Sequence, residues 1–249
     1  MNDEAKKLRF FIGILVLVVV IMSYYVGYFS SKLGFDAPFI PNSGTKQPVA
    51  VANPQKQAPE EEFKQVEEVP YFDLKGDEVT KGNSNSNIVL VEFTDLQCPF
   101  CARFHPTIES ILGKNNLKLA TRHFPLSFHQ FAKDYAIMFE CLAKNNGNTQ
   151  AYNFVNNLFK INMDKRGNVS LEDGLTEARK QGLSDASLNS CKSDSVITSK
   201  IQGSFDDGIK MGINGTPALY ILNTNSKKAV RVNGLVEEKV LQDEINKIK

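Results

Sequence analysis

Residues 88–106 read IVLVEFTDLQCPFCARFHP, and this stretch decides the fold class. The apolar, β-branched run at its start, residues 88–93, is typical of a buried strand. A helix should begin at the cysteine pair, Cys98 and Cys101, and Pro106 should kink that helix unless the helix restarts there. Two cysteines at this spacing could form half of a metal site, a structural disulfide or a redox-active pair.

The rest of the chain predicts an α/β sheet with helices inserted in its middle. The expected elements are, in order, a strand at 117–124, a helical block at about 127–211, strands at 218–222 and 229–234, and a closing helix at 236–248. This order indicates a small α/β fold. A CxxC pair at the junction of a strand and a helix in such a pattern favours a thioredoxin-like redox motif.

A metal site and a structural disulfide both explain the Cys98–Cys101 pair poorly. A structural zinc site needs four ligands, commonly two CxxC pairs or one CxxC with two histidines at helical spacing. Cys141 and Cys191 are fifty positions apart, and His105, His123 and His129 form no such ligand pair, so we expect no metal and no other cofactor. A disulfide within CxxC closes too small a loop to constrain the chain much. A pair active in thiol exchange fits best.

The predicted helix N-terminus explains why exchange chemistry would work there. The thiolate is the attacking species, and free backbone N–H groups together with the helix dipole stabilise it. An ordinary cysteine has a pKa of about 8.5, so the pKa must fall for ready reaction near neutral pH. Pro99 suits the first turn of the helix. We therefore expect Cys98 to be the exposed nucleophile and Cys101, one turn along, to be a shielded resolving thiol.

A second element lies 116 residues beyond Cys101, in GINGTPALYIL. Pro217 stands just before a predicted strand, where an X–Pro bond can adopt the otherwise rare cis form. Most Gly-Thr-Pro loops are ordinary turns, but together with an upstream CxxC at a strand–helix junction this loop indicates a redox site.

From about residue 70 to residue 249 the chain resembles the DsbA-like thiol:disulfide oxidoreductases. The motifs that carry the resemblance follow the family's order: VEFTDLQCPFC, RHFPL at 122–126, FECLA around Cys141, and GINGTPALYIL. The resemblance implies a thioredoxin-like fold with an inserted α-helical domain. It also implies that Cys98 and Cys101 are the active pair, and that the cis-proline loop at Thr216 and Pro217 binds an extended client peptide through its backbone.

Two residues depart from the pattern of the well-known oxidising members. Those members carry a histidine in the dipeptide between the cysteines, whereas this chain has Pro99 and Phe100. The resemblance also associates a threonine before the cis-proline, here Thr216, with isomerase-type members. The direction of thiol exchange therefore stays open at this point.

Four further residues are candidates for supporting roles. In an exported protein, one CxxC and one distant pair favour a structural disulfide between Cys141 and Cys191, with two buried free thiols as the alternative. Glu92 lies on the predicted strand and would be either a solvated glutamate or, as the resemblance implies, a buried acid that exchanges protons with Cys101. Asp95 is expected to be a turn or capping residue.

The N-terminal segment predicts a membrane anchor. Three basic residues within 1–9 precede an uncharged apolar run at 10–29, and twenty helical residues span roughly 30 Å, the thickness of a bilayer core. The basic flank predicts a cytoplasmic tail, which leaves the rest of the chain outside the cytoplasm. A cleaved signal peptide is the alternative, although no good A-x-A site follows the apolar run. Residues 30–69 hold five of the ten prolines and predict a flexible linker to the domain at 70–249.

These observations together predict a thiol oxidase on the periplasmic side of the inner membrane. A formal net charge of +1, with no basic stripe, argues against nucleic acid as a partner. The expected partners are reduced or unfolded exported proteins and, by resemblance, a quinone-linked reoxidant of the DsbB or VKOR kind, with the protein itself a monomer. The alternatives are a disulfide isomerase or reductase of the same fold and, in another class, an anchored peptide-binding chaperone or metal carrier.

Overall fold

The computed structural model describes residues 65–249 together with five helical positions near the N-terminus, Leu15, Val18, Ile21, Met22 and Tyr25. The chain divides into two units, Met1–Ala58 and Pro59–Lys249, and the fold below is that of the second. Among the described residues, no helix is long and apolar enough to cross a membrane. The predicted tail at 1–9, the anchor at 10–29 apart from those five positions, and most of the linker at 30–69 lie outside the described residues.

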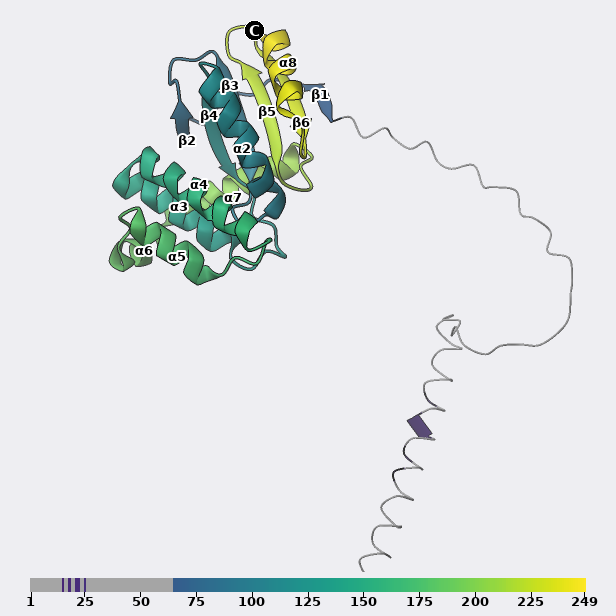
Figure 1. Ribbon diagram of the computed structural model, residues 1–249, viewed down its shortest axis with the longest axis vertical. Helices are drawn as coiled ribbons and strands as arrows, with labels where there is room; N and C mark the ends of the chain where they lie inside the picture. The colour runs from purple at the N-terminus through teal and green to yellow at the C-terminus, as the bar shows by residue number, and fades with distance from the viewer. Residues whose placement is uncertain (1–14, 16–17, 19–20, 23–24, 26–64) are drawn as a thin grey trace, which may run out of the picture. The chain divides into compact units, whose positions relative to one another are not determined.

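A mixed sheet forms the centre of the second unit (Figure 1). Its strands in the described residues are β1 (Val66–Val69), β2 (Val79–Gly82), β3 (Ile88–Thr94), β4 (Lys118–His123), β5 (Ala218–Asn223) and β6 (Lys228–Asn233). Their order across the sheet is β1-β6-β5-β3-β4-β2, with β3 and β4 parallel and the other neighbours antiparallel. Strand β3 lies between β5 and β4 and is buried along its whole length, which makes it a rigid base for the segment that follows it.

Both faces of the sheet are covered by helices. Alternate side chains of β3 point to opposite faces, as in any strand. Leu90 packs in a core shared with α2 (Pro99–Lys114) and α8 (Glu238–Ile248), whereas Phe93 packs in a second core with Phe124, against which Phe205 of α7 (Ser195–Lys210) lies. The segment after β3 therefore enters α2 directly over the first core.

A helical block separates β4 from β5. It consists of α3 (Ala132–Asn146), α4 (Asn148–Asp164), α5 (Leu171–Lys180), α6 (Asp185–Lys192) and α7. Figure 1 shows α3 to α6 as a group at one end of the sheet. Fully buried aromatic side chains, Tyr135, Phe139, Phe154 and Phe159, fill this group, and a capping box between Ser170 and Asp173 begins α5. The fold is thus a thioredoxin-like α/β sheet with an inserted helical unit.

The predicted linker extended too far. Residues 66–69 form β1, which pairs antiparallel with β6, so the chain is ordered into the sheet before residue 70. The acidic sequence EEEFKQVEE at 60–68 is typical of a solvated tether, but Val66 packs against one core of the sheet and Val69 against the other, while Glu67 binds Arg231. The short strand β2 was also missed, because VTKG has little apolar character apart from Val79.

Helix α2 runs without interruption from Pro99 to Lys114, with Pro106 inside it. The restart that the sequence left open does not occur. Proline lacks an N–H, so this position cannot donate to the carbonyl one turn earlier, and the helix tolerates the loss while its buried face packs on the sheet.

Candidate active site

The turn between β3 and α2 is built around Asp95, which is 1% exposed. Its Oδ1 accepts a hydrogen bond from the backbone N–H of Gln97 at 2.8 Å. Its Oδ2 accepts one from the N–H of Leu126, also at 2.8 Å, and lies 2.8 Å from Nδ1 of His129. A buried carboxylate with several donors holds a turn rigidly, so Asp95 fixes the approach to Cys98.

Cys98 occupies the N-cap position of α2, with extended backbone angles of φ −68° and ψ 123°. Pro99 follows in the first turn, and the N–H of Ala102 donates to the carbonyl of Cys98 at 3.0 Å. The sulfur of Cys98 therefore lies at the positive end of the helix, where the first N–H groups have no helical partner.

Both cysteines of the pair are free thiols, and both are buried: Cys98 is 2% exposed and Cys101 is 0% exposed. The prediction of an exposed nucleophile is therefore wrong for Cys98. The reason is the loop at Thr216, whose carbonyl oxygen lies 3.6 Å from Sγ of Cys98. The Thr216–Pro217 bond is cis, and the carbonyl of Pro217 accepts from the N–H of Gly234.

The pKa values of the two thiols shift in opposite directions. The pKa of Cys98 falls to about 6, chiefly because the thiol of Cys101 donates to its sulfur, while burial acts in the other direction; backbone N–H groups of Phe100 and Cys101 also lower it. The pKa of Cys101 rises well above its ordinary value because of burial and because of its contact with Cys98. At neutral pH the reduced pair thus holds one thiolate, on Cys98, and one thiol.

Glu92 lies under the pair and is 3% exposed. Glu92 lies two positions after Leu90 on β3, so both side chains face the core that also contains α2, and the solvated alternative for Glu92 is wrong. Its Oε1 has no hydrogen-bond partner among the described residues. Burial raises the pKa of Glu92 to about 7, and its charge raises the pKa of Cys101.

Two large apolar side chains, Phe100 and Phe128, are exposed to solvent. Phe100 is 50% exposed, and the guanidinium of Arg103 lies 4.6 Å from its ring centroid. Phe128 is 76% exposed and contacts His129 ring to ring at 4.6 Å. No sequence motif predicts a role for Arg103 or Phe128. Phe128 lies in a segment without regular structure, and its exposure in the folded chain is the feature that distinguishes it.

The second cysteine pair lies apart from this site. Cys141 on α3 and Cys191 on α6 form a disulfide with a Cα–Cα distance of 5.8 Å, and both are buried. The free-thiol alternative is therefore wrong. His105 and His123 have structural partners instead: His105 lies 2.7 Å from Asn156, and His123 lies 3.0 Å from Glu140.

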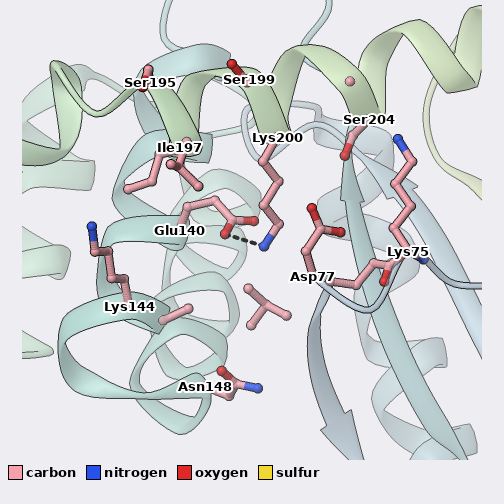
Figure 2. A pocket seen from close by; sticks show the side chains of 15 residues that line it. Lys75, Asp77, Glu140, Lys144, Asn148, Ser195, Ile197, Ser199, Lys200 and Ser204 are labelled. Atoms are coloured by element: carbon pink, nitrogen blue, oxygen red, sulfur yellow. Dashed lines mark hydrogen bonds and ion pairs between the residues drawn. The ribbon is translucent and has the colours of Figure 1, made fainter.

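A pocket of about 700 Å³ lies between α3, α7 and the chain before β2, away from the CxxC pair (Figure 2). Five of its six charged side chains, all but Asp77, form ion pairs within the protein. Figure 2 shows the amino group of Lys200 directed at Glu140, 2.6 Å away, and Lys144 binds Asp194 in the same way. Neither cysteine of the CxxC pair lines this pocket, and its internal ion pairs leave little charge for a ligand.

Comparisons with known proteins agree with this geometry. Residues 74–238 match the family model described as thioredoxin. A Rickettsia conorii protein described as a protein-disulfide oxidoreductase is 30% identical over 89 residues, which span 34% of this chain and 31% of that protein. The chain therefore matches only about a third of that relative's length.

Solved structures share the fold at low sequence identity. The thiol-disulfide exchange protein alpha-DsbA2 of Wolbachia pipientis has a TM-score of 0.58 and 20% identity, over 68% of this chain and 86% of that one. Alpha-DsbA1 of Wolbachia pipientis has a TM-score of 0.58 and 24% identity, over 71% and 92%. DsbA2 of Pseudomonas aeruginosa has a TM-score of 0.55 and 22% identity, over 69% and 94%.

Proposed function

This chain belongs to the thioredoxin family, and on that premise we propose that it is a DsbA-like thiol oxidase that donates the Cys98–Cys101 disulfide to client proteins. The observation that carries the proposal is the unequal pair: a sulfur of lowered pKa at a helix N-terminus, next to a buried sulfur of raised pKa. Buried structural cysteines lack such a thiolate, whereas exchange-active cysteines require one.

The reaction proceeds from the oxidised pair. A client thiolate attacks Sγ of Cys98, the bond between Cys98 and Cys101 breaks, and Cys101 leaves as a thiolate that takes up a proton. A second client thiolate then attacks the client sulfur of the mixed disulfide, and Cys98 leaves as a thiolate. The client loses two electrons and gains a disulfide, while the pair gains two electrons and is reduced.

The lowered pKa of Cys98 favours this direction. A thiol of low pKa is a good leaving group, so the second step is fast. Its thiolate also stabilises the reduced form of the pair, which makes the disulfide a stronger oxidant. Both effects support an oxidase over a reductase.

Glu92 supplies the proton chemistry in this proposal. Cys101 is fully buried, so the thiolate that leaves in the first step is unstable without a proton. A carboxyl with a pKa of about 7 exists in both forms near neutral pH, and Glu92 interacts electrostatically with Cys101. We assign Glu92 the role of giving this proton to Cys101 and taking it back on reoxidation.

The proposed location is outside the cytoplasm, on a membrane anchor. The apolar run at 10–29 with its basic flank supports the anchor, and residues 30 to about 65 would tether the catalytic domain. The disulfide between Cys141 and Cys191 supports an oxidising compartment. The proposed clients are reduced exported proteins, and a quinone-linked membrane protein of the DsbB or VKOR kind would reoxidise the monomeric enzyme.

A single-turnover experiment tests the function. The oxidised protein is mixed with an equal amount of a reduced, unfolded two-cysteine peptide, and free thiols on both are counted by alkylation and mass spectrometry. An oxidase yields one peptide disulfide for each Cys98–Cys101 disulfide lost, and Cys98→Ser yields none. A reduced isomerase would instead rearrange the disulfides of a scrambled protein. A binding module would change no thiols.

A further inference from the structure

A pocket of about 460 Å³ begins at the residue next to Cys98. It lies between the first turns of α2 and the end of α4 with the turn that follows. Its lining consists of Pro99, Arg103, Asn162, Met163, Arg166 and Gly167.

A hydrogen bond joins the α4 side of this pocket to the turn between β3 and α2. Asn162 on α4 donates from Nδ2 to the carbonyl of Gln97, the residue before Cys98, at 2.8 Å. The turn after α4 then places Arg166 with φ 53° and Gly167 with φ 90°, conformations that a non-glycine residue adopts only at a cost. A Cβ on Gly167 would lie 3.6 Å from Cβ of Pro99, so the turn packs against the active-site dipeptide.

The charge of the pocket is unbalanced. Among the residues that the structure describes, Arg122, Arg179 and Arg231 each bind a carboxylate. Arg103 and Arg166 have no acidic partner in that part of the chain, and both line this pocket, whose lining contains no aspartate or glutamate. Two guanidinium groups at one site, neither with a carboxylate partner in the described residues, favour an anionic ligand, and guanidinium groups suit carboxylates in particular.

Two other features point to a peptide as the ligand. Asn162 is 0% exposed, and its buried Oδ1 has no hydrogen-bond partner among the described residues. A buried acceptor without a partner is costly, and a peptide N–H would satisfy it. Met163 is 41% exposed and offers an adaptable apolar contact.

We propose that this pocket binds an acidic side chain of the client, close in sequence to the client cysteine that attacks Cys98. The inference rests on the proposed function, because it names a class of client for the same site. Arg103 and Arg166 bind the carboxylate, Met163 contacts a neighbouring apolar side chain, and Asn162 accepts from the client backbone. The protein therefore prefers client cysteines that have aspartate or glutamate nearby.

The test measures peptide binding without thiol chemistry. Fluorescent ten-residue peptides carry serine in place of cysteine, with Asp, Asn or Lys two residues before or after it. Their Kd values are measured by anisotropy for the wild-type protein, for Arg103→Gln with Arg166→Gln, and for Arg179→Gln. Arg179 lies on α5 and pairs with Asp185, so its loss changes the net charge without touching the pocket.

The wild-type protein and Arg179→Gln should bind the Asp peptide about tenfold more tightly than the Lys peptide, and the double variant should lose this preference. The wild-type preference should also shrink as salt increases. Equal Kd values for the three peptides, or a preference that survives in the double variant or at high salt, would overturn the inference.

The cysteine-containing versions of the peptides separate this inference from the proposed function. If the wild-type protein prefers the Asp peptide in binding but oxidises none of them, the oxidase proposal fails and the acidic subsite stands. If it oxidises all three with equal kcat/KM and binds them equally, the subsite is wrong and the oxidase proposal stands.

Discussion

The Sγ atom of Cys98 lies 3.6 Å from the carbonyl oxygen of Thr216, although the two residues are 118 positions apart in the chain. The contact joins the strand–helix junction that carries the thiols to the loop that precedes β5. It also explains why Cys98 is covered. A client that reaches the sulfur must therefore approach along this loop, where backbone groups are available to an extended peptide.

Cys101→Ala should trap long-lived mixed disulfides with clients, whereas Cys98→Ala should trap few. The reason is that Cys98 has the lowered pKa and the helix N-terminal position, while the pKa of Cys101 is raised by burial. Non-reducing electrophoresis after incubation with a reduced, unfolded protein measures the trapped species. Equal trapping by the two variants, or a reversal, would contradict the assignment of roles.

Glu92→Gln should make the stability of the oxidised protein less dependent on pH. Burial raises the pKa of Glu92 from 4.5 to about 7, so its contribution to stability is fully present below pH 4.5 and is lost as pH rises through 7. The stability of the variant relative to wild type should therefore rise by up to about 3 kcal/mol between pH 4 and pH 8.5.

Urea unfolding of both oxidised proteins across this range measures the difference, and in the oxidised state the cysteines do not titrate. A difference that stays constant with pH would show that Glu92 keeps an ordinary pKa. The same variant should also slow the single-turnover reaction, because the Cys101 thiolate would lose its proton donor.

Phe100→His should lower the pKa of Cys98 further and make the disulfide more oxidising. A histidine can donate a hydrogen bond or carry positive charge near the sulfur, and phenylalanine can do neither. Thiolate absorbance against pH should give a midpoint near pH 6 for the reduced wild-type protein and a lower one for the variant. For this couple, about 30 mV corresponds to roughly 1.4 kcal/mol.

A matched control for this change is Phe128→His, since Phe128 is also exposed but does not lie between the cysteines. It should leave the absorbance midpoint and the potential unchanged. If Phe100→His also changes neither quantity, the dipeptide does not control the redox behaviour of the pair.

The disulfide between Cys141 and Cys191 should stay closed while the active pair is reduced and reoxidised. It is buried in the helical unit, and it closes a loop with a sequence separation of 50, worth roughly 4 kcal/mol in the chain-entropy model. Mass spectrometry after mild reduction should find alkylation at Cys98 and Cys101 alone. Replacing Cys141 and Cys191 together by alanine should lower the Tm but keep client oxidation; alkylation of Cys141 under mild conditions would contradict this view.

The sequence predicted those parts of the site that have a local signal. The apolar run into Cys98, the proline after it and the Gly-Thr-Pro loop each occupy a few adjacent residues, and the order of elements indicated the sheet. The pairing of Cys141 with Cys191 followed from the cysteine count in a chain that the sequence predicts to be exported. The burial of Glu92 could be expected only from the resemblance, because strand alternation alone does not say which face is covered.

The remaining parts of the site arise from contacts between distant segments. The coverage of Cys98 depends on the loop at Thr216, and the position of His129 depends on its contact with Asp95. Asn162 and Arg166 reach the active site only because α4 packs beside α2. Strand β1 was missed for a similar reason, since a four-residue strand within an acidic run is stabilised by its neighbour β6.

The reduction potential of the Cys98–Cys101 pair tests the central claim most directly. The reduced and oxidised fractions are measured by thiol alkylation after equilibration of the protein with glutathione at fixed ratios and pH 7. An oxidase with a stabilised Cys98 thiolate should have a potential between about −120 and −180 mV, the range from DsbA to protein disulfide isomerase. A potential near about −270 mV, the value for thioredoxin, would instead make this protein a reductase and would contradict the account.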